Sequence, residues 1–195
     1  NMFEKAQEAY ENGYTILVLS DRSVSADKIA IPSLLAVSAM HQYLVQKGTR
    51  TSVGLVIESG EPREVHHFAT LIGFGAAAVN PYMAYEAIRG LREEGLLELD
   101  YDTAVYNYNK AVLKGITKIL SKMGISTIQS YMGAQIFEAI GIGKDVIDRY
   151  FTNTVSRIGG IGLEEIQKES EIKHENGFKD KTCLLYTSPS PRDCS

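Results

Sequence analysis

The stretch Thr51–Pro81, TSVGLVIESGEPREVHHFATLIGFGAAAVNP, decides the fold of this chain. Its first part, Ser52–Ile57, is a short aliphatic run of the kind that forms a buried strand. A polar turn and Pro62 follow, and proline is favoured at the first position of a helix, where its missing N–H leaves no bond unmade. Apolar residues then recur at helical spacing, at Val65, Phe68, Ala69 and Ile72. Two glycines end this helix and Ala76–Val79 begins a second strand, so the stretch has the order and size of a βαβ unit.

The preceding residues extend this unit by one more strand and one more helix. Thr15–Leu19 is a third aliphatic run, and Pro32 opens a helix with one mainly apolar face that ends at Gly48. The order strand–helix–strand–helix–strand from Thr15 to Asn80 predicts a parallel sheet with right-handed crossovers. We therefore predict an α/β fold built on a three-stranded parallel βαβαβ sheet packed by helices.

Beyond this sheet the pattern becomes mostly helical. Asn80 and Pro81 form a favourable helix start, with asparagine as the cap and proline at the first position. A longer helix of about 20 residues, or about 30 Å, follows. We expect Asp102 or Thr103 to cap this helix and Gly124 to end it.

The C-terminal segment is predicted as a series of shorter helices. Helical patterns cover Tyr131–Ile140 and Lys144–Phe151, and a further helix begins in Leu163–Glu169. Gly141–Gly143 and Gly159–Gly162 are interpreted as glycine-rich links between them.

Composition limits the classes of partner. Hydrophobic residues make up 44 % of the 195 residues and charged residues 23 %, as in ordinary globular proteins, and the formal net charge is −4. A negative chain offers no electrostatic attraction for nucleic acid or an anionic membrane, and no apolar run approaches the roughly 20 residues that span a bilayer. Without an apolar leader or a cysteine pattern, we expect a reducing compartment: the cytoplasm, or the plastid stroma of a photosynthetic eukaryote.

Both ends of the sequence suggest a piece of a longer protein. The chain begins at Asn1 directly in a charged segment, and Thr182–Ser195 changes composition abruptly. We interpret residues 182–195 as a non-native read-through or, alternatively, a disordered Ser/Pro tail.

Two short motifs invite a nucleotide-binding interpretation, and neither supports it. Gly141–Lys144 lacks the earlier glycine and the following serine or threonine of a phosphate loop, so a helix break explains it better. Tyr106 and Lys110 have the spacing of a carbonyl-polarising dyad, but no glycine-rich dinucleotide turn precedes them, and chance is the better explanation.

The histidines give no site either. Glu64 and His67 share a helix face, whereas His66 diverges from its neighbour by about 100°. A single Glu-x-x-His needs partners from other helices to bind metal, so a surface or interface group is favoured over acid–base chemistry. We predict no catalytic residue and no metal ligand in this chain.

Polar residues follow two of the predicted strands and are the candidates for a functional edge. Ser20, Asp21 and Arg22 come directly after the first strand, and Glu58 and Ser59 after the second. Open α/β sheets bind ligands at the carboxyl ends of their strands. Ordinary loop capping explains the same residues equally well.

Longer stretches resemble the large (alpha) subunit of glutamate synthase. The resemblance is carried by LVLSDR, IPSLLAVSAMHQYLV and VGLVIESGEPREVHHFATLIGFGAAAVNPY, and later by KGITKILSKMGISTIQSYMGAQIFEAIG and RYFTNTVSRIGGIGLEEI. It covers most of Tyr14–Ile166 in order. By this resemblance, residues 1–101 are the C-terminal part of the central domain and residues 102–181 the N-terminal segment of the FMN-binding synthase domain.

The resemblance implies an oxidoreductase of nitrogen metabolism. In this family a glutaminase domain releases ammonia from glutamine, and the ammonia passes through a tunnel to 2-oxoglutarate. Reduced FMN then delivers a hydride to the imine, which gives L-glutamate. Electrons reach FMN through an iron–sulfur cluster from an NAD(P)H-oxidising small subunit or domain, or from ferredoxin.

Most of that equipment is expected in other parts of the polypeptide, so we predict that this piece alone is inactive and binds no cofactor tightly. Ser20, Asp21, Arg22, Glu58 and Ser59 become candidates for a tunnel or interface loop. Six further residues are candidates for supporting the cofactor site, or for packing at a domain junction: Ser121, Lys122, Met123, Gly124, Ser130 and Tyr131. The alternative from another class is a non-catalytic α/β ligand-binding or scaffold module.

Overall fold

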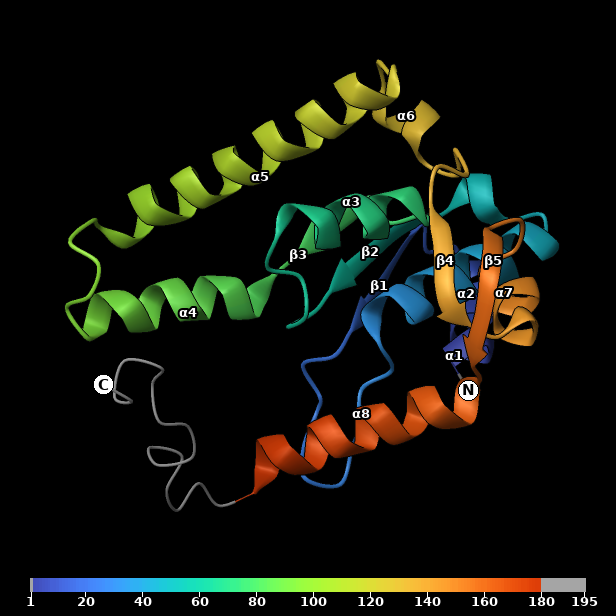
Figure 1. Cartoon of the computed structure of the whole chain (residues 1–195), viewed down its shortest axis with the longest axis horizontal. Coiled ribbons are helices and arrows are strands. Elements are labelled where there is room, and N and C mark those ends of the chain that lie inside the picture. The colour runs from blue at the N-terminus through green and yellow to red at the C-terminus, as the bar shows by residue number, and fades with distance from the viewer. Residues whose placement is uncertain (1, 180–195) are drawn as a thin grey trace, which may run out of the picture.

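Three short aliphatic strands form the predicted parallel sheet, which confirms the α/β fold class (Figure 1). The computed structural model describes residues 2–179, so the predictions for residues 182–195 and both cysteines lie outside the described residues. The strands are β1 (Ile16–Ser20), β2 (Gly54–Glu58) and β3 (Ala78–Asn80), in that spatial order. In this register, residues whose side chains point to the same face of the sheet lie side by side across all three strands.

One face of this sheet carries the main core. Helices α1 (Met2–Glu11), α2 (Ser33–Gln46) and α3 (Val65–Gly73) all contribute to it. The fully or nearly fully buried side chains of this core are Ala6, Leu17, Val37, Met40, Leu44, Val53, Leu55, Ile57, Leu71 and Ala76. Side chains alternate along a strand, so Ile16 and Val18 point to the opposite face, where they are 63 % and 58 % exposed. The described helices therefore cover one face of β1 and leave its other face open.

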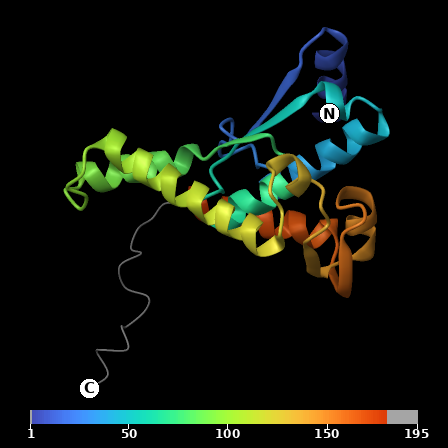
Figure 2. The same cartoon turned by 90° about the horizontal axis from the view of Figure 1, so that it is seen from above.

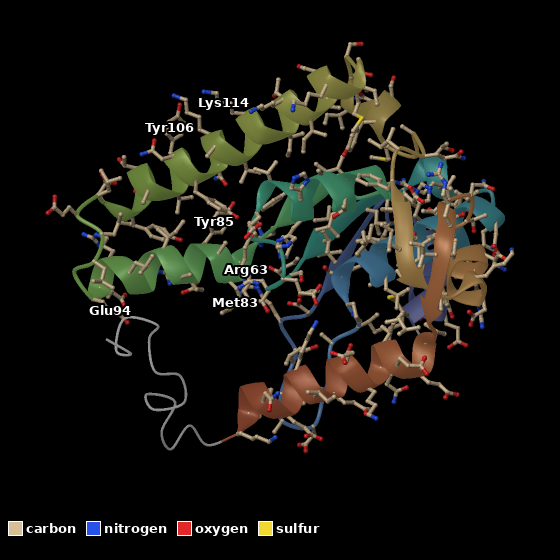
Figure 3. The ribbon with its side chains drawn as sticks, in the orientation of Figure 1. Arg63, Met83, Tyr85, Glu94, Tyr106 and Lys114 are labelled. Carbon is tan, nitrogen blue, oxygen red and sulfur yellow. The ribbon has the colours of Figure 1, made fainter. Side chains whose placement is uncertain are left out.

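The next two helices form an antiparallel pair that projects from the sheet (Figures 1 and 2). They are α4 (Tyr82–Glu93) and α5 (Tyr101–Met123). Tyr85 lies between them, donates a hydrogen bond to Asn109 Oδ1 over 3.1 Å, and stacks edge-on against a tyrosine of α5 (Figure 3).

Helix α5 also packs on α3 through a second, smaller core. Phe68 of α3 meets Val112 and Ile116 of α5, and all three are buried. Gly115 allows the close approach, because a Cβ there would lie 2.5 Å from a Val65 methyl group. The long helix is thereby attached to the α/β unit along its middle.

The helix starts differ from the prediction by one to three residues. Pro32 and Pro81 occupy the cap position of α2 and α4 and not the first helical position, and Asn80, predicted to cap α4, is the last residue of β3. The cap of α5 is Asp100, whose side chain accepts a hydrogen bond from Thr103 N, so the prediction of Asp102 or Thr103 is wrong by two or three residues. Helix α3 begins at Val65 and not at Pro62, because Glu64 and the His67 side chain form a capping box that starts the helix there. The predicted end of α5 at Gly124 is confirmed, since this residue adopts the left-handed conformation.

The C-terminal segment contains a second sheet that the sequence did not predict. The helix predicted over Tyr131–Ile140 is wrong, and the chain forms α6 (Ile128–Tyr131) and then β4 (Glu138–Ile142). After α7 (Lys144–Tyr150), β5 (Val155–Ile161) pairs with β4 in parallel, and α8 (Leu163–Phe178) follows.

The two glycine-rich stretches interpreted as links are therefore largely strand. A Cβ on Gly160 would lie 2.2 Å from Gly141 O, so only glycine allows β4 and β5 to approach at this point. Val146, Ile147 and Phe151 pack this βαβ unit against α2 and Phe74.

Arg50, in the 3-10 turn η1 (Arg50–Ser52), joins four parts of the chain. Its guanidinium donates to His41 Nδ1 of α2 over 2.9 Å, to Val53 O and Gly75 O over 2.8 Å each, and to Met132 Sδ over 3.6 Å. The bond to His41 requires a neutral imidazole acceptor. Burial of the ring, and secondarily the adjacent Arg50, lowers the pKa of His41 to about 4.

We predict that Gly115→Ala lowers the free energy of unfolding by about 1–3 kcal/mol, because the new methyl group overlaps Val65 and forces α5 away from α3. Gly90→Ala in α4 is the matched control, since no atom lies within 4 Å of its added Cβ. This control should raise stability by about 0.5–1 kcal/mol through helix propensity alone. Urea unfolding followed by circular dichroism measures both, and an equal gain for the two variants contradicts the close packing of α5 on α3.

We also predict that His41 makes the fold weaker in mild acid. The unfolded histidine binds a proton below about pH 6.5, whereas the folded one stays neutral down to a pKa of about 4. The contribution of neutral His41 to the free energy of unfolding is therefore complete above pH 6.5. It is lost as the pH falls from 6.5 to 4, which lowers the free energy of unfolding by on the order of 2 kcal/mol for this partly exposed ring. His41→Gln should remove this part of the pH dependence, and the exposed His66→Gln should keep it, as measured by denaturation at pH 4, 5, 6 and 7.

Candidate functional site

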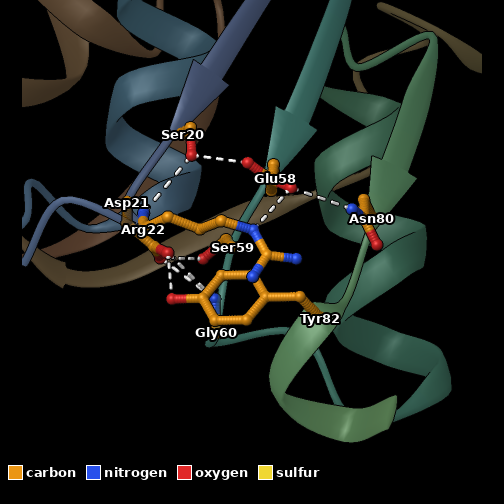
Figure 4. A network of polar contacts seen from close by, with 8 residues as sticks. All are labelled: Ser20, Asp21, Arg22, Glu58, Ser59, Gly60, Asn80 and Tyr82. Carbon is orange, nitrogen blue, oxygen red and sulfur yellow. Dashed lines mark hydrogen bonds and ion pairs between the residues drawn. The ribbon is translucent and has the colours of Figure 1, made fainter. Parts of the chain in front are cut away.

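Polar side chains gather where the three parallel strands end (Figure 4). Ser20, Glu58 and Asn80 are the last residues of β1, β2 and β3, and the register aligns them side by side. Carboxyl ends of parallel strands share one sheet edge, so the chain topology alone brings these three residues together. We call the eight residues in Figure 4 the carboxyl-edge cluster: Ser20, Asp21, Arg22, Glu58, Ser59, Gly60, Asn80 and Tyr82.

Glu58 is the centre of the first half of the cluster. Its carboxylate accepts hydrogen bonds from Ser20 Oγ over 2.7 Å, from Arg22 Nε over 2.8 Å and from Asn80 Nδ2 over 3.1 Å. The bond from Ser20, and then the one from Arg22, lowers the pKa of Glu58 below its ordinary value. The group is thus a carboxylate held by three donors from three segments, and it is poorly suited to accept a proton as a general base.

Asp21 is the centre of the second half. It accepts from Ser59 Oγ over 2.6 Å, from the Gly60 N–H over 3.0 Å and from Tyr82 OH over 2.7 Å. Burial, and then the bond to Asp21, raises the pKa of Tyr82 to about 12. Ser59 is fully buried, so its hydroxyl depends on Asp21 as an acceptor.

Arg22 connects the two halves. Its Nε contacts Glu58, and its guanidinium lies 4.2 Å from the centre of the Tyr82 ring, which is a cation–π geometry. The Arg22 side chain is nevertheless 52 % exposed. Part of the guanidinium is therefore available at the surface for an acidic or carbonyl group of another segment.

This arrangement can position loops and offer a cation, but it has no catalytic constellation. Both carboxylates are occupied by internal donors, and the Ser59 hydroxyl donates to Asp21 while accepting from the Glu61 N–H over 3.2 Å. No serine here has a histidine or lysine base at hydrogen-bond distance among the bonds that the described residues make. Residues 2–179 also contain no group of three or more metal-ligating side chains.

The structure brings together all five residues that the sequence singled out at the strand ends. Their role in a tunnel or an interface stays a prediction. Sequence reasoning missed the other three members: Gly60, which follows Ser59, and Asn80 and Tyr82, which lie one and three residues after the third predicted strand. Applying the strand-end rule to that strand would have found the last two.

The candidates for cofactor support lie elsewhere in the structure. Ser121, Lys122, Met123 and Gly124 are exposed at the C-terminal end of α5, where the helix dipole is negative and disfavours a phosphate. Tyr131 is 1 % exposed and packs edge-on against Phe137, so its ring offers no face to a flavin.

Ser130, the third residue of the four-residue helix α6, completes this group and is hydrogen-bonded to the side chain of Thr127, which caps the helix. As they lie here, these residues do not fit FMN. No chemical step follows from them, and their supporting role stays a prediction.

The remaining candidates have structural partners. His67 Nδ1 accepts from the N–H groups of Arg63 and Glu64 over 3.1 and 3.3 Å, and these bonds cap α3. Because Nδ1 is used in this way, it is not directed with Glu64 at a common metal ion. Tyr106 points away from the body of the molecule in Figure 3, and the Lys110 ammonium lies 5.7 Å from its ring.

We predict that Asp21→Ala lowers the free energy of unfolding by about 2–3 kcal/mol, because it leaves the buried Ser59 hydroxyl and the Gly60 N–H without their acceptor. The matched control is Asp27→Ala in the same loop, where the side chain is exposed and the change should stay within about 0.5 kcal/mol. Urea denaturation measures both, and equal stabilities of the two variants contradict a closed hydrogen-bond cluster.

Residues 1–143 match the family described as the glutamate synthase central domain. The match extends past residue 101, and a boundary between domains at 101 stays a prediction. Within residues 2–179, no helix is both long enough and apolar enough to cross a membrane.

The individual relatives have long polypeptides. The chain is 52 % identical over 180 residues to the glutamate synthase [NADPH] large chain of Bacillus subtilis, covering 92 % of this chain and 12 % of that protein. It is 47 % identical to the glutamate synthase [NADH] of Schizosaccharomyces pombe, covering 89 % and 8 %. It is 45 % identical to the chloroplastic ferredoxin-dependent glutamate synthase of spinach, covering 92 % and 12 %. The chain thus spans about an eighth or less of these relatives, and the family match over most of its residues shows that it belongs to the glutamate synthase central domain family.

Proposed function

We propose that this chain is a non-catalytic part of a glutamate synthase large chain. The whole protein would form L-glutamate from glutamine and 2-oxoglutarate, by release of ammonia, its passage through a tunnel and a flavin-dependent reductive amination. The relatives support this proposal, since they are glutamate synthases that depend on NADPH, NADH or ferredoxin. The cytoplasm or a plastid stroma would be its compartment.

The observation that carries the non-catalytic role is the closed carboxyl-edge cluster. Its two carboxylates accept hydrogen bonds from internal donors, and these bonds hold three loops in one arrangement. A fixed edge with one half-exposed cation, Arg22, suits contact with another part of the same polypeptide. We propose that this edge forms an interface loop, or the wall of the ammonia passage, in the whole enzyme.

FMN and the iron–sulfur cluster would be held by other parts of the polypeptide. Residues 2–179 supply no cluster of metal ligands, and the end of α5 is electrostatically unsuited to a flavin phosphate. When bound, these groups supply hydride and electron transfer, and this chain would contribute support to the surrounding structure. The electron donor would likewise bind elsewhere, whether it is ferredoxin or a small subunit that oxidises NAD(P)H.

A ligand-binding module is the alternative from another class, and the cluster does not favour it. A ligand at this edge would compete with Ser20, Arg22 and Asn80 for Glu58, or with Ser59 and Tyr82 for Asp21. Displacing the donors of Asp21 would leave the buried Ser59 hydroxyl without its acceptor, which costs more than an exposed ligand contact returns.

The test uses the full-length enzyme with Arg22→Ala. We expect the glutaminase rate to stay within about twofold, while glutamate formed per ammonia released falls by about tenfold, the factor that a lost contact of about 1.4 kcal/mol gives. Arg89→Ala is the matched control, since Arg89 is also half-exposed and paired, with Glu86 on its own helix. It should change neither quantity.

Two outcomes would contradict the proposal. A full-length protein that forms no glutamate from glutamine and 2-oxoglutarate with any of the three donors is not a glutamate synthase. A tight stoichiometric FMN complex of the 195-residue chain, seen by flavin absorbance after desalting, contradicts its assignment as a part without the cofactor site.

A further inference from the structure

Strand β1 uses only one of its two edges within the described residues. Gly54 N donates to Thr15 O over 2.8 Å, and Asp21 N donates to Glu58 O over 3.1 Å. Peptide groups alternate in direction along a strand, so those of Leu17 and Leu19 also face β2. The N–H and C=O groups of the intervening residues, Ile16 and Val18 among them, therefore point to the opposite edge, where β1 has no neighbouring strand in residues 2–179.

Helix α1 occupies the position of a crossover helix. In this sheet α2 leads into β2 and α3 into β3, each packed on the same face. Helix α1 leads into β1 and packs on that face too, with Ala6 in the core beside Leu17 and Phe3 stacked 4.8 Å from Tyr43 of α2. A helix in this position normally connects two neighbouring parallel strands. The strand that precedes such a helix would lie beside β1, at the edge opposite to β2.

A groove runs along the same open edge. It has a volume of about 650 Å³ and lies between α1, β1 and the loop that follows β1. Its walls are mainly apolar and include Ala6, Ala9, Leu17, Val24, Ile29 and Ile31. An extended segment beside β1 would point alternate side chains into this groove and the others toward the open face of Ile16 and Val18.

We propose that the open edge of β1 binds one further parallel strand, supplied by the same polypeptide in the longer protein and joined to β1 through α1. Its peptide groups would pair with those of Ile16 and Val18, and its inward side chains would be aliphatic. The relatives support an occupant from the same chain, because the matched region is only 12 % of the Bacillus subtilis protein. The proposal goes beyond the proposed function but rests on one part of it, namely that this chain belongs to a longer polypeptide.

Hydrogen–deuterium exchange of peptides covering residues 14–22 tests this strand. The N–H groups of Ile16 and Val18 should exchange at least about 100-fold more slowly in the full-length protein than in the 195-residue chain. The N–H groups that face β2, such as that of Asp21, should be protected in both. Equal exchange of Ile16 and Val18 in the two proteins would overturn the proposal.

Proline substitution gives an independent measurement, because proline removes one N–H. Val18→Pro should leave the 195-residue chain folded and should speed exchange of the neighbouring β1 amides in the full-length protein about tenfold or more. The matched disruptive variant is Val56→Pro in the central strand, which removes a bond between β1 and β2 and should weaken both proteins.

The other occupant of an open edge is a second copy of the chain. Protection of Ile16 and Val18 that grows with the concentration of the 195-residue chain, and is no greater in the full-length protein, would identify that occupant and overturn the proposal.

Discussion

Parallel pairing of β1, β2 and β3 is the constraint on which the other features depend. Parallel strands need a returning segment between each pair, and here α2 and α3 supply it while covering one sheet face. Leu55 and Ile57 of the central strand are buried against these helices, at 0 % and 3 % exposure. The same topology sends every strand end to one edge, so the position of the polar cluster follows from the requirement to pair the strands.

Charge balance then determines what that edge can do. Glu58 and Asp21 would repel each other if their donors were removed, but each is surrounded by hydroxyl, amide or guanidinium groups from other segments. Arg22 contributes to both halves, through Glu58 on one side and the Tyr82 ring on the other. Such a network is cooperative, because each bond orients the next donor, and it makes the edge a rigid surface with no free acid or base.

The sequence predicted the parts of the fold that depend on local pattern, and missed those that depend on tertiary contacts. Three aliphatic runs bounded by turns were sufficient to predict β1, β2 and β3. Gly124, which adopts the left-handed conformation, was sufficient to predict the end of α5. Strands β4 and β5 were missed because Gly141 and Gly160 interrupt their aliphatic pattern, and the need for glycine arises only when the two strands meet. Arg50 likewise has no sequence signal, since His41, Gly75 and Met132 lie 9, 25 and 82 residues away from it in the chain.

At the candidate site, five members followed from the rule that ligand loops lie after strands, whereas the pairing of Asp21 with Tyr82 required the turn from β3 into α4. The two sheets also share a property that bears on the role of this region. The β4–β5 pair is a two-stranded parallel sheet with Ile140 and Ile158 at 68 % and 60 % exposure, much like the open face of β1. Two-stranded sheets are marginal alone, and parallel sheets normally bury both faces. A region with apolar strand faces on both of its sheets is therefore suited to being packed within a larger polypeptide, where its closed polar edge fixes loop positions and its apolar faces bind neighbouring segments.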